Sequence, residues 1–204
     1  MSTYTALQAD VASYLHRTDL SSGSPTPIQS FIEKARLRVA RDLRSLEQES
    51  TSTLTGPTAD VFALPTDFME ARKVHSAGVP LRSVNFDEIT YWTAASSPYV
   101  YCIFGRNLWS PGATTISLGY FKIEAALTSG ATEHPTMAAQ PQIWLYASLA
   151  EAGLYIRDFE LMDRMTQAYS AEVQAVNARA ELARQGVAPS MISDSLSIQS
   201  MAIL

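Results

Sequence analysis

Residues 142–156 constrain the fold more than any other segment, because they are apolar almost all the way round a helix. Ile143 and Ala147 lie on one side with Leu154, and Leu149 lies with other large apolar side chains on the remaining sides. A helix without a polar face has to be covered on every side. We therefore expect a helical core built around residues 142–156, in which both Leu149 and Leu154 are buried.

Three further helices are predicted from apolar residues that recur at steps of three and four. Residues 5–17 and 27–49 form two N-terminal helices, and Pro27 is well placed to open the second of them. Residues 159–185 form a long C-terminal helix whose apolar seam is typical of packing against a long neighbouring helix.

Between these helices the sequence changes to short alternating strands separated by turn residues. The first two strands are expected to pair as a hairpin around Gly56 and Pro57, and a later pair turns at Gly105 and Arg106. The expected strands are residues 51–55, 61–64, 72–76, 80–84, 99–104, 107–109 and 114–123, with a short helix at 85–89 and a polar loop at 128–141.

The predicted fold class is α+β and mainly α: a bundle of four helices, two N-terminal and two long C-terminal, with a small antiparallel β-rich insertion and an extended C-terminal tail. Residues 1–50 and 139–186 form the expected bundle, residues 51–138 the insertion, and residues 187–204 the tail.

The chain carries few charges. Only 17% of its residues are charged and its net charge is −5, whereas about a quarter charged is usual for a soluble domain. Low charge suggests that partners cover part of the surface.

A protein that binds duplex nucleic acid would have a basic footprint, which this composition lacks. The nearest candidate for such a patch is a group of arginines that alternate with acidic residues: Arg36, Arg38, Arg41 and Arg44.

The sequence lacks motifs for catalysis or metal binding. The three histidines, His16, His75 and His134, lie in separate segments with no ligand spacing around them. Cys102 is the only cysteine, so no intrachain disulfide is possible, and its apolar strand predicts a core residue. We therefore expect no enzyme, no cofactor and no bound metal.

Paired carboxylates could be interpreted as a glycosidase site, which needs two carboxyl groups at a fixed separation. Acidic residues are also common at helix starts and in turns, where they need no catalytic role, and we favour that interpretation. The pairs in question are Asp67 with Glu70, Asp87 with Glu88, and Asp158 with Glu160.

The sequence predicts neither a signal peptide nor a membrane span. Residues 1–4 offer no basic or apolar region of a signal peptide, and no stretch approaches the roughly 20 apolar residues of a membrane span. We expect a soluble protein of a reducing compartment.

Four stretches, in order, resemble the head-to-tail adaptor (tail accessory factor) proteins of short-tailed and related bacteriophages. They are residues 7–20 (LQADVASYLHRTDL), 31–44 (FIEKARLRVARDLR), 63–70 (ALPTDFME) and 144–152 (WLYASLAEA). Each is a packing pattern rather than a chemical motif, and the resemblance covers about residues 5–185.

The resemblance implies a structural protein at the head–tail junction of the virion, made in the host cytoplasm. Such proteins form a dodecameric ring of identical subunits beneath the portal protein, extend the DNA channel and hold the tail nozzle, tube or fibre proteins. Double-stranded DNA would pass the lumen during genome ejection without specific binding, which suits a net negative charge. The alternatives are another phage ring or tail-completion protein, or a tail-associated peptidoglycan hydrolase.

Two groups of residues are predicted to dock on these partners. Leu37, Arg41 and Arg44 form an inter-subunit flank that meets a neighbouring subunit or the portal. An apolar side chain among charged ones suggests that a partner protein covers it. The alternative is an ordinary solvated helix face.

The C-terminal tail forms the second group. Two of its apolar residues alternate with polar ones as in a strand that has no partner strand nearby. We predict that it orders on assembly and docks on the portal or a neighbouring subunit, whereas the alternative is a disordered terminus. The docking residues are Ile192, Leu196, Ile198, Ile203 and Leu204.

Overall fold

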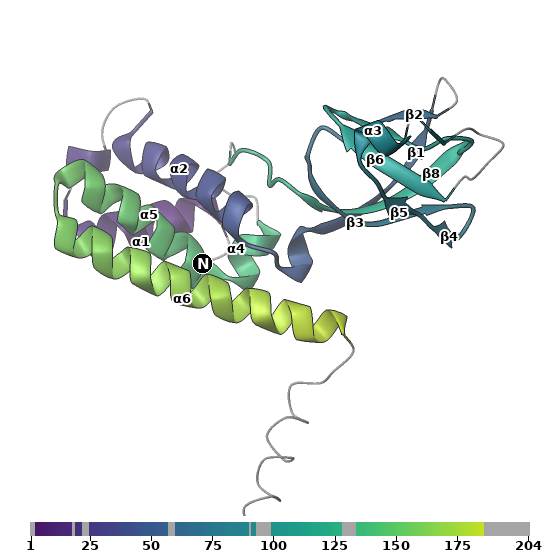
Figure 1. The fold of residues 1–204 in the computed structure, drawn as a ribbon. Helices are drawn as coiled ribbons and strands as arrows, with labels where there is room; N and C mark the ends of the chain where they lie inside the picture. The colour runs from purple at the N-terminus through teal and green to yellow at the C-terminus, as the bar shows by residue number, and fades with distance from the viewer. Residues whose placement is uncertain are drawn as a thin grey trace, which may run out of the picture. The chain divides into compact units, whose positions relative to one another are not determined.

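The computed structural model describes residues 3–17, 19–21, 25–56, 60–89, 91–92, 99–127 and 134–185 (Figure 1). The chain divides into two compact units. The helical unit comprises Met1–Glu47 and Ala126–Leu204, and the β unit comprises Gln48–Ala125. The β unit is thus inserted into the chain of the helical unit.

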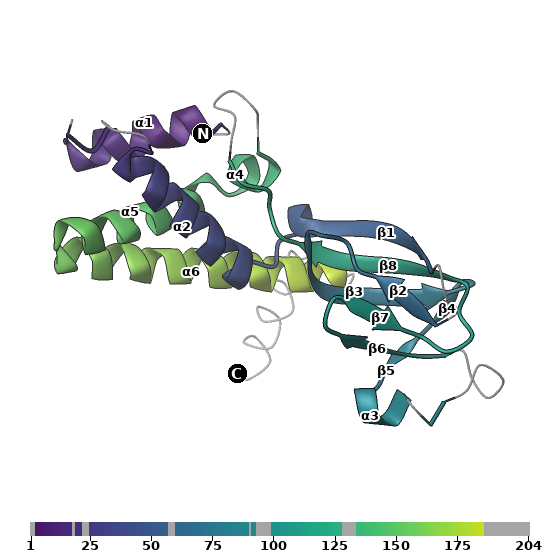
Figure 2. The same cartoon turned by 90° about the horizontal axis from the view of Figure 1, so that it is seen from above.

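Helix α5 (Pro141–Ile156) is the centre of the helical unit, and it lies between α2 and α6 (Figures 1 and 2). Its residues Ile143, Trp144 and Leu149 are all buried to 1% exposure or less. The expectation that this apolar segment forms the core is confirmed. The other described helices of the unit are α1 (Tyr4–Leu15), α2 (Pro27–Asp42), α4 (Pro135–Ala139) and α6 (Phe159–Arg184), with a short 3-10 turn at Asp19–Ser21.

Helix α2 begins as the sequence predicts but ends earlier. Thr26 caps its start, accepting from the backbone N–H of Gln29, while the Gln29 side chain accepts from the backbone N–H of Thr26. The predicted continuation to residue 49 is wrong, because the backbone becomes extended at Leu43. A 3-10 turn at Leu46–Gln48 follows before the first strand.

A tight corner joins α5 to α6. Arg157 adopts the left-handed conformation with φ 61°, and the Asp158 carboxylate caps α6 by accepting from the backbone N–H of Leu161 at 3.0 Å. Gly153 allows α5 to approach the first turn of α6 closely, because a Cβ at this position would lie 2.8 Å from the backbone nitrogen of Met162.

The β unit contains two sheets of four strands among the described residues. The first has the order β1-β8-β3-β4 and the second has the order β2-β7-β6-β5, with a short helix, α3 (Phe86–Ile89), beside the second. The strands are β1 (Glu49–Thr55), β2 (Val61–Ala63), β3 (Phe68–Ser76), β4 (Val79–Pro80), β5 (Arg82–Ser83), β6 (Val100–Phe104), β7 (Asn107–Trp109) and β8 (Thr115–Lys122).

Strand β8 organises the first sheet, because it pairs antiparallel with both β1 and β3. Its residues Ile116 and Leu118 point to one face and are fully buried, as expected for the period of two along a strand. They pack with Phe62 and Leu108 from the second sheet in one hydrophobic cluster.

The predicted fold class is wrong, because it assigns too little of the chain to β-sheet. The described residues form six α-helices and two four-stranded sheets, so the protein is a mixed α+β chain and not a four-helix bundle with a small insertion. The insertion is not wholly antiparallel either, since β5 pairs parallel with β6. A β segment with two sheets buries its own core, which a small hairpin insertion cannot do.

Local predictions in the β unit had mixed outcomes. The turn at Gly105 and Arg106 does join two paired strands, β6 and β7. The first predicted hairpin is wrong, because β1 pairs with β8 and β2 pairs with β7 instead. The predicted loop at residues 128–141 contains α4.

Candidate docking surfaces

The outward side of α2 presents four exposed residues at steps of three and four: Ser30, Lys34, Leu37 and Arg41, here called the α2 face. This spacing places them on one side of the helix, and the buried residues of α2 pack into the core on the other side. The Leu37 side chain is 55% exposed. The structure therefore brings two of the three predicted flank residues, Leu37 and Arg41, onto one exposed face.

Arg41 and Arg44 differ in their surroundings. The Arg41 side chain is 74% exposed, and its Nε donates to Asp42 Oδ1 at 2.8 Å. Arg44 lies beyond the last residue of α2, and its Nη1 donates to the backbone carbonyl oxygens of Arg41 and Leu43, both at 2.8 Å. Arg44 thus caps the C-terminal end of α2, where carbonyl groups lack helical donors.

The buried Tyr169 links α6 to the end of α2. Its hydroxyl donates to Asp42 Oδ2 at 3.1 Å, and the Arg38 guanidinium lies 4.7 Å from its ring centroid. Burial and the Asp42 carboxylate raise the pKa of Tyr169 well above its usual range, so the hydroxyl remains a donor. Burial opposes ionisation of Asp42, but hydrogen bonds from Arg41 and Tyr169 outweigh it and lower the pKa of Asp42.

The corner between α5 and α6 exposes a group of large apolar side chains, here called the corner patch: Leu154 at 53%, Tyr155 at 61% and Phe159 at 59%. The Tyr155 ring packs against Phe31 of α2, with the ring centroids 5.2 Å apart. The prediction that Leu154 is buried is therefore wrong. Leu154 lies near the end of α5, where the chain turns back into α6 and no described element covers it.

The β unit exposes an aromatic group that the sequence analysis missed. Phe86 of α3 stacks on Phe104 of β6 with ring centroids 4.4 Å apart, and it meets Trp109 of β7 at right angles at 6.0 Å. The signal was available in β6, whose adjacent Ile103 and Phe104 are both apolar, since neighbouring strand residues point to opposite faces. Phe104 is 57% exposed.

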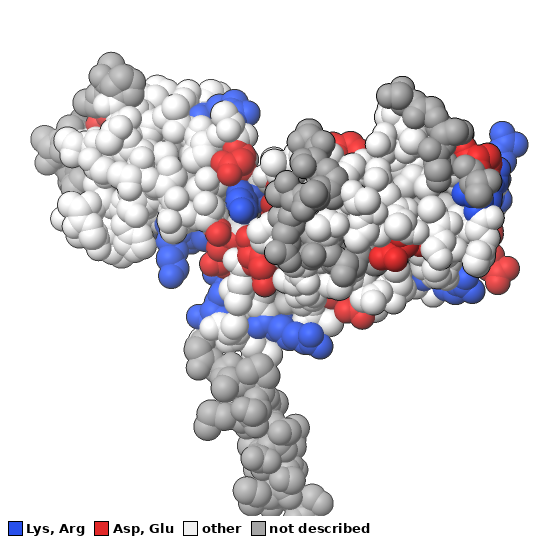
Figure 3. Space-filling view, turned by 180° about the vertical axis from the view of Figure 1, so that it is seen from behind, with Lys and Arg blue, Asp and Glu red and all other residues white. Residues whose placement is uncertain are grey.

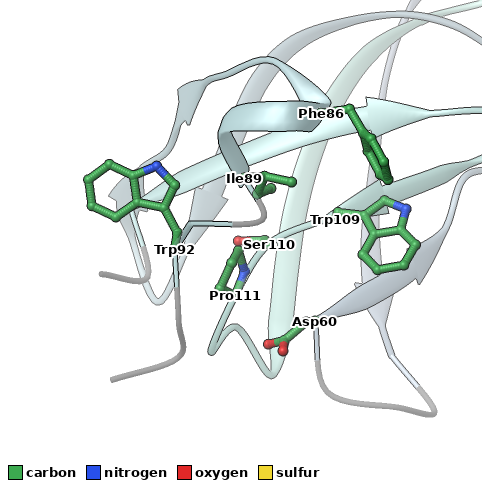
Figure 4. Close-up of a pocket in the computed structure, with 7 residues that line it drawn as sticks. All are labelled: Asp60, Phe86, Ile89, Trp92, Trp109, Ser110 and Pro111. Atoms are coloured by element: carbon green, nitrogen blue, oxygen red, sulfur yellow. The ribbon is translucent and has the colours of Figure 1, made fainter. Parts of the chain in front are cut away.

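Beside this group lies a cavity of about 200 Å³ (Figure 4). Three of its lining residues, Phe86, Trp92 and Trp109, are aromatic; the others are Asp60, Ile89, Ser110 and Pro111. In the close-up, the indole nitrogen of Trp109 lies on the side of the ring that faces Phe86.

Two polar groups of this cavity have partners within the chain, whereas the buried Trp109 Nε1 has no hydrogen-bond partner among the described residues. An Asp60 carboxylate oxygen accepts from the backbone N–H of Gly112, and the Ser110 hydroxyl donates to the Val100 carbonyl oxygen at 2.9 Å. A cavity with mainly aromatic walls suits a mainly apolar side chain.

Several of the residues considered for catalysis or metal binding make contacts within the described chain or are buried in it. Asp67 accepts from the Tyr120 hydroxyl at 3.0 Å, and Glu88 pairs with Arg82 at 3.2 Å. Cys102 is confirmed as buried, and its burial raises the pKa of the thiol. His134 contacts Thr136 at 3.1 Å.

Charged side chains are sparse on the face drawn in Figure 3, where most of the described surface is neither acidic nor basic. Within the described residues, no cluster of three or more histidine, cysteine, aspartate or glutamate side chains could hold a metal ion. No helix in this part of the chain is long and apolar enough to cross a membrane.

The predicted tail contacts lie outside the described residues. These are the docking residues Ile192, Leu196, Ile198, Ile203 and Leu204. The described part of α6 ends at Arg184, followed by Gln185.

Comparison with known proteins identifies the family of the chain. None of the curated proteins compared with it matches. The model of a family described as "SU10 adaptor protein" matches residues 2–193, which is nearly the whole chain. This match confirms the resemblance to phage head-to-tail adaptors drawn from four short stretches of sequence. The chain belongs to the SU10 adaptor protein family.

Proposed function

We propose that the protein is a structural head-to-tail adaptor that forms a ring of identical subunits, twelve in number, beneath the portal of a tailed phage. The ring extends the channel for double-stranded DNA and provides the surface to which the tail attaches. The observation that carries this proposal is the family match over residues 2–193. In this role the protein is not an enzyme and needs no cofactor.

The surface of the described residues supports such a role. A subunit in a ring buries surface on two flanks, and larger exposed apolar patches mark sites of interaction between proteins. The helical unit has the corner patch and the exposed Leu37, and the β unit has the aromatic group around Phe104. The net charge of −5 favours a channel in which DNA slides, because lysine and arginine contacts to phosphates would retain it.

The tail is the proposed anchor on the portal. An extended segment that adds to a sheet edge or groove gains main-chain hydrogen bonds, while alternate side chains fill pockets. Leu196 and Ile198 have that alternation, and Ile192, Ile203 and Leu204 would extend the apolar contact. The aromatic cavity of the β unit suits an apolar side chain from a tail protein of the nozzle, tube or fibre class.

Binding to a cognate portal ring tests this function. The full-length chain is mixed with the portal, and the complex is characterised by native mass spectrometry and electron microscopy. A ring of adaptor subunits on the portal is expected, and deletion of residues 190–204 should leave a folded protein that no longer docks. Failure of the full-length chain to bind any portal, or hydrolysis of peptidoglycan by it, would overturn the proposal.

A further inference from the structure

We propose that the C-terminal segment of the chain adds a strand to the free edge of β1 in the same subunit before assembly. The segment is residues 195–199, with the sequence Ser-Leu-Ser-Ile-Gln. The inference rests on neither the ring nor the portal. It goes beyond the proposed function by giving the tail a binding site that it occupies before it reaches the portal.

Strand β1 lies at the edge of its sheet, because β8 is its only neighbour among the described strands (Figure 2). In an antiparallel pair, every second residue of an edge strand directs its N–H and C=O groups away from the neighbour. Within the described part of the chain, residues 50–55 form backbone hydrogen bonds with β8 alone. The free edge of β1 therefore offers a row of backbone donors and acceptors to another strand.

This edge has none of the features that usually block further pairing, such as a proline, a lysine, a bulge or a very short strand. Strand β1 has seven residues, none of them proline or lysine, and it pairs with β8 in an unbroken register. Its one charged residue, Glu49, lies at its start. Strand β1 is thus open to a further strand along most of its length.

The other sheet edges of the β unit are blocked by their length or composition. Strand β4, at the opposite edge of the same sheet, has two residues, one of which is Pro80. Strands β2 and β5, at the edges of the second sheet, have three and two residues. An added strand would therefore bind at β1 in preference to the other described edges.

One face of β1 is lined with hydroxyl groups. Thr51, Thr53 and Thr55 are all exposed on this face. Two of them continue into β8, where Thr53 lies opposite Ser117 and Thr55 lies opposite Thr115. A strand added at this edge would need small polar side chains on the same face.

The other face of β1 belongs to the hydrophobic cluster of the β unit. Leu54 is buried in that cluster and lies opposite Ile116. Ser52, which is half-buried, lies opposite the fully buried Leu118. Because Ser52 is small, large apolar side chains of an added strand would extend the cluster at this edge. The edge therefore fits a strand that alternates apolar with small polar residues.

The C-terminal segment has this alternation. Leu196 and Ile198 alternate with Ser195, Ser197 and Gln199. Because side chains alternate between the two faces of a strand, both apolar residues would lie on the side of the hydrophobic cluster. The polar residues would then continue the row of hydroxyl groups. Main-chain hydrogen bonds would supply affinity, and the side chains would select this alternation.

The segment is tethered within reach of the start of β1. Arg184 Nη2 donates to the backbone carbonyl oxygen of Arg44 at 2.7 Å. Glu49 follows Arg44 by five positions, and this stretch spans at most about 18 Å. Residues 185–194 can extend over about 33 Å. A short flexible tether gives an effective concentration of about 1 mM or more, so a dilute subunit binds its own segment rather than that of another copy.

This pairing would keep the edge of β1 covered until assembly. An open edge strand can pair with the same edge of another copy, which leads to aggregation. Because the proposed function assigns Leu196 and Ile198 to the portal, the portal would compete with β1 for them.

Amide hydrogen exchange tests the pairing, followed residue by residue by NMR in the isolated full-length chain. The test variant combines Ser197→Pro with Ile198→Pro, because two consecutive prolines remove an N–H group from each side of the strand. The matched control combines Met201→Pro with Ala202→Pro, which lie outside the proposed strand.

Every second amide within residues 50–55 should exchange about tenfold or more faster in the test variant than in the wild type or the control. The intervening amides should be unchanged, because they bond to β8. Equal exchange in all three proteins, or faster exchange without this alternation, would overturn the pairing.

Protein concentration separates the subunit's own segment from that of another copy. Protection of the edge amides should not depend on concentration, and protection that grows with concentration would overturn the inference. The portal is absent from these measurements. Their failure therefore leaves the proposed function standing, and failure of the chain to bind a portal leaves the pairing standing.

Discussion

The side-chain amide of Asn177 in α6 donates to the backbone carbonyl oxygen of Asp42, the last residue of α2, at 3.0 Å. The Asn177 Oδ1 in turn accepts from the backbone N–H of Arg44 at 2.7 Å. One side chain thus satisfies a donor and an acceptor of the backbone just where α2 stops. Arg184 adds a third bond, from its Nη2 to the Arg44 carbonyl oxygen at 2.7 Å.

Replacement of Asn177 by alanine should destabilise the protein. The change leaves two backbone groups in a partly buried position without their partners, and each such loss costs about 1–3 kcal/mol. Chemical denaturation should therefore show a free energy of unfolding lower by at least about 1 kcal/mol. Glu172→Ala, at an exposed position of the same helix, is the control. Equal stability of the two variants would contradict the role of Asn177.

Asp42 should make stability depend on pH. Its pKa is lowered in the folded protein by hydrogen bonds from Arg41 and Tyr169, which outweigh its partial burial. A lowered folded-state pKa gives stability that is present above the unfolded pKa, about 3.9, and lost as the pH falls through the folded value.

The measurement compares wild type with Asp42→Asn at several pH values. The variant should be less stable at pH 7 by about 1–2 kcal/mol, and the difference should shrink as the pH falls below about 4. Asp10→Asn, at an exposed position of α1, controls for the general effect of acid. A difference that stays constant with pH would show that the Asp42 charge is unimportant.

Gly153→Ala should destabilise the corner between α5 and α6. Alanine normally gains about 1 kcal/mol over glycine inside a helix. Here its Cβ would lie 2.8 Å from the backbone nitrogen of Met162 and 3.1 Å from the Asp158 carbonyl oxygen. Because both atoms belong to the backbone, the helices must shift, and overpacking of this kind costs about 1–3 kcal/mol.

Gly119→Ala is the matched control for this substitution. A Cβ at Gly119 would meet its nearest neighbour, Lys73 Cβ, at 3.6 Å, which is ordinary contact. Thermal melting should therefore show a lower midpoint for Gly153→Ala and an unchanged or higher midpoint for Gly119→Ala. The reverse order would mean that helix propensity decides the result at Gly153.

Two leucines of α5 should respond differently to truncation. Leu149 is fully buried, so Leu149→Ala should cost about 2–5 kcal/mol through the cavity that it leaves. Leu154 is 53% exposed, and surface substitutions usually change stability by less than about 0.5 kcal/mol. Denaturation of the two variants at a concentration where the chain is monomeric checks the difference. Similar losses would indicate that Leu154 is covered.

The helices were predictable from sequence to the extent that local patterns determine them. The apolar segment at residues 142–156, the capping box at Thr26 and the N-cap at Asp158 are all local signals. The end of α2 was not predictable, because apolar residues continue at helical spacing through Leu43. Asn177 and Arg184, more than 130 positions later in the chain, bind the backbone that leaves the helix.

The sheets were predictable as strands but not as pairs. Two separate strands, β1 and β2, do form where the sequence predicts them, yet β1 pairs with a strand about 60 positions later. Turn residues specify where a strand stops and carry no information about a distant partner. The corner patch was missed for a related reason: apolar periodicity predicts burial without revealing where the covering elements end.

Glu49, the first residue of β1, lies directly across from Phe121, near the end of β8, in an antiparallel pair. The chain therefore enters and leaves the β unit through adjacent positions, and Cα atoms paired in this way are about 5 Å apart. An inserted unit whose two ends lie side by side can change in length or be exchanged without altering the path of the chain on either side of it. For the helical unit each such change is equivalent to a change in a single loop, so proteins built on this plan can acquire a new β-unit surface while keeping their helices.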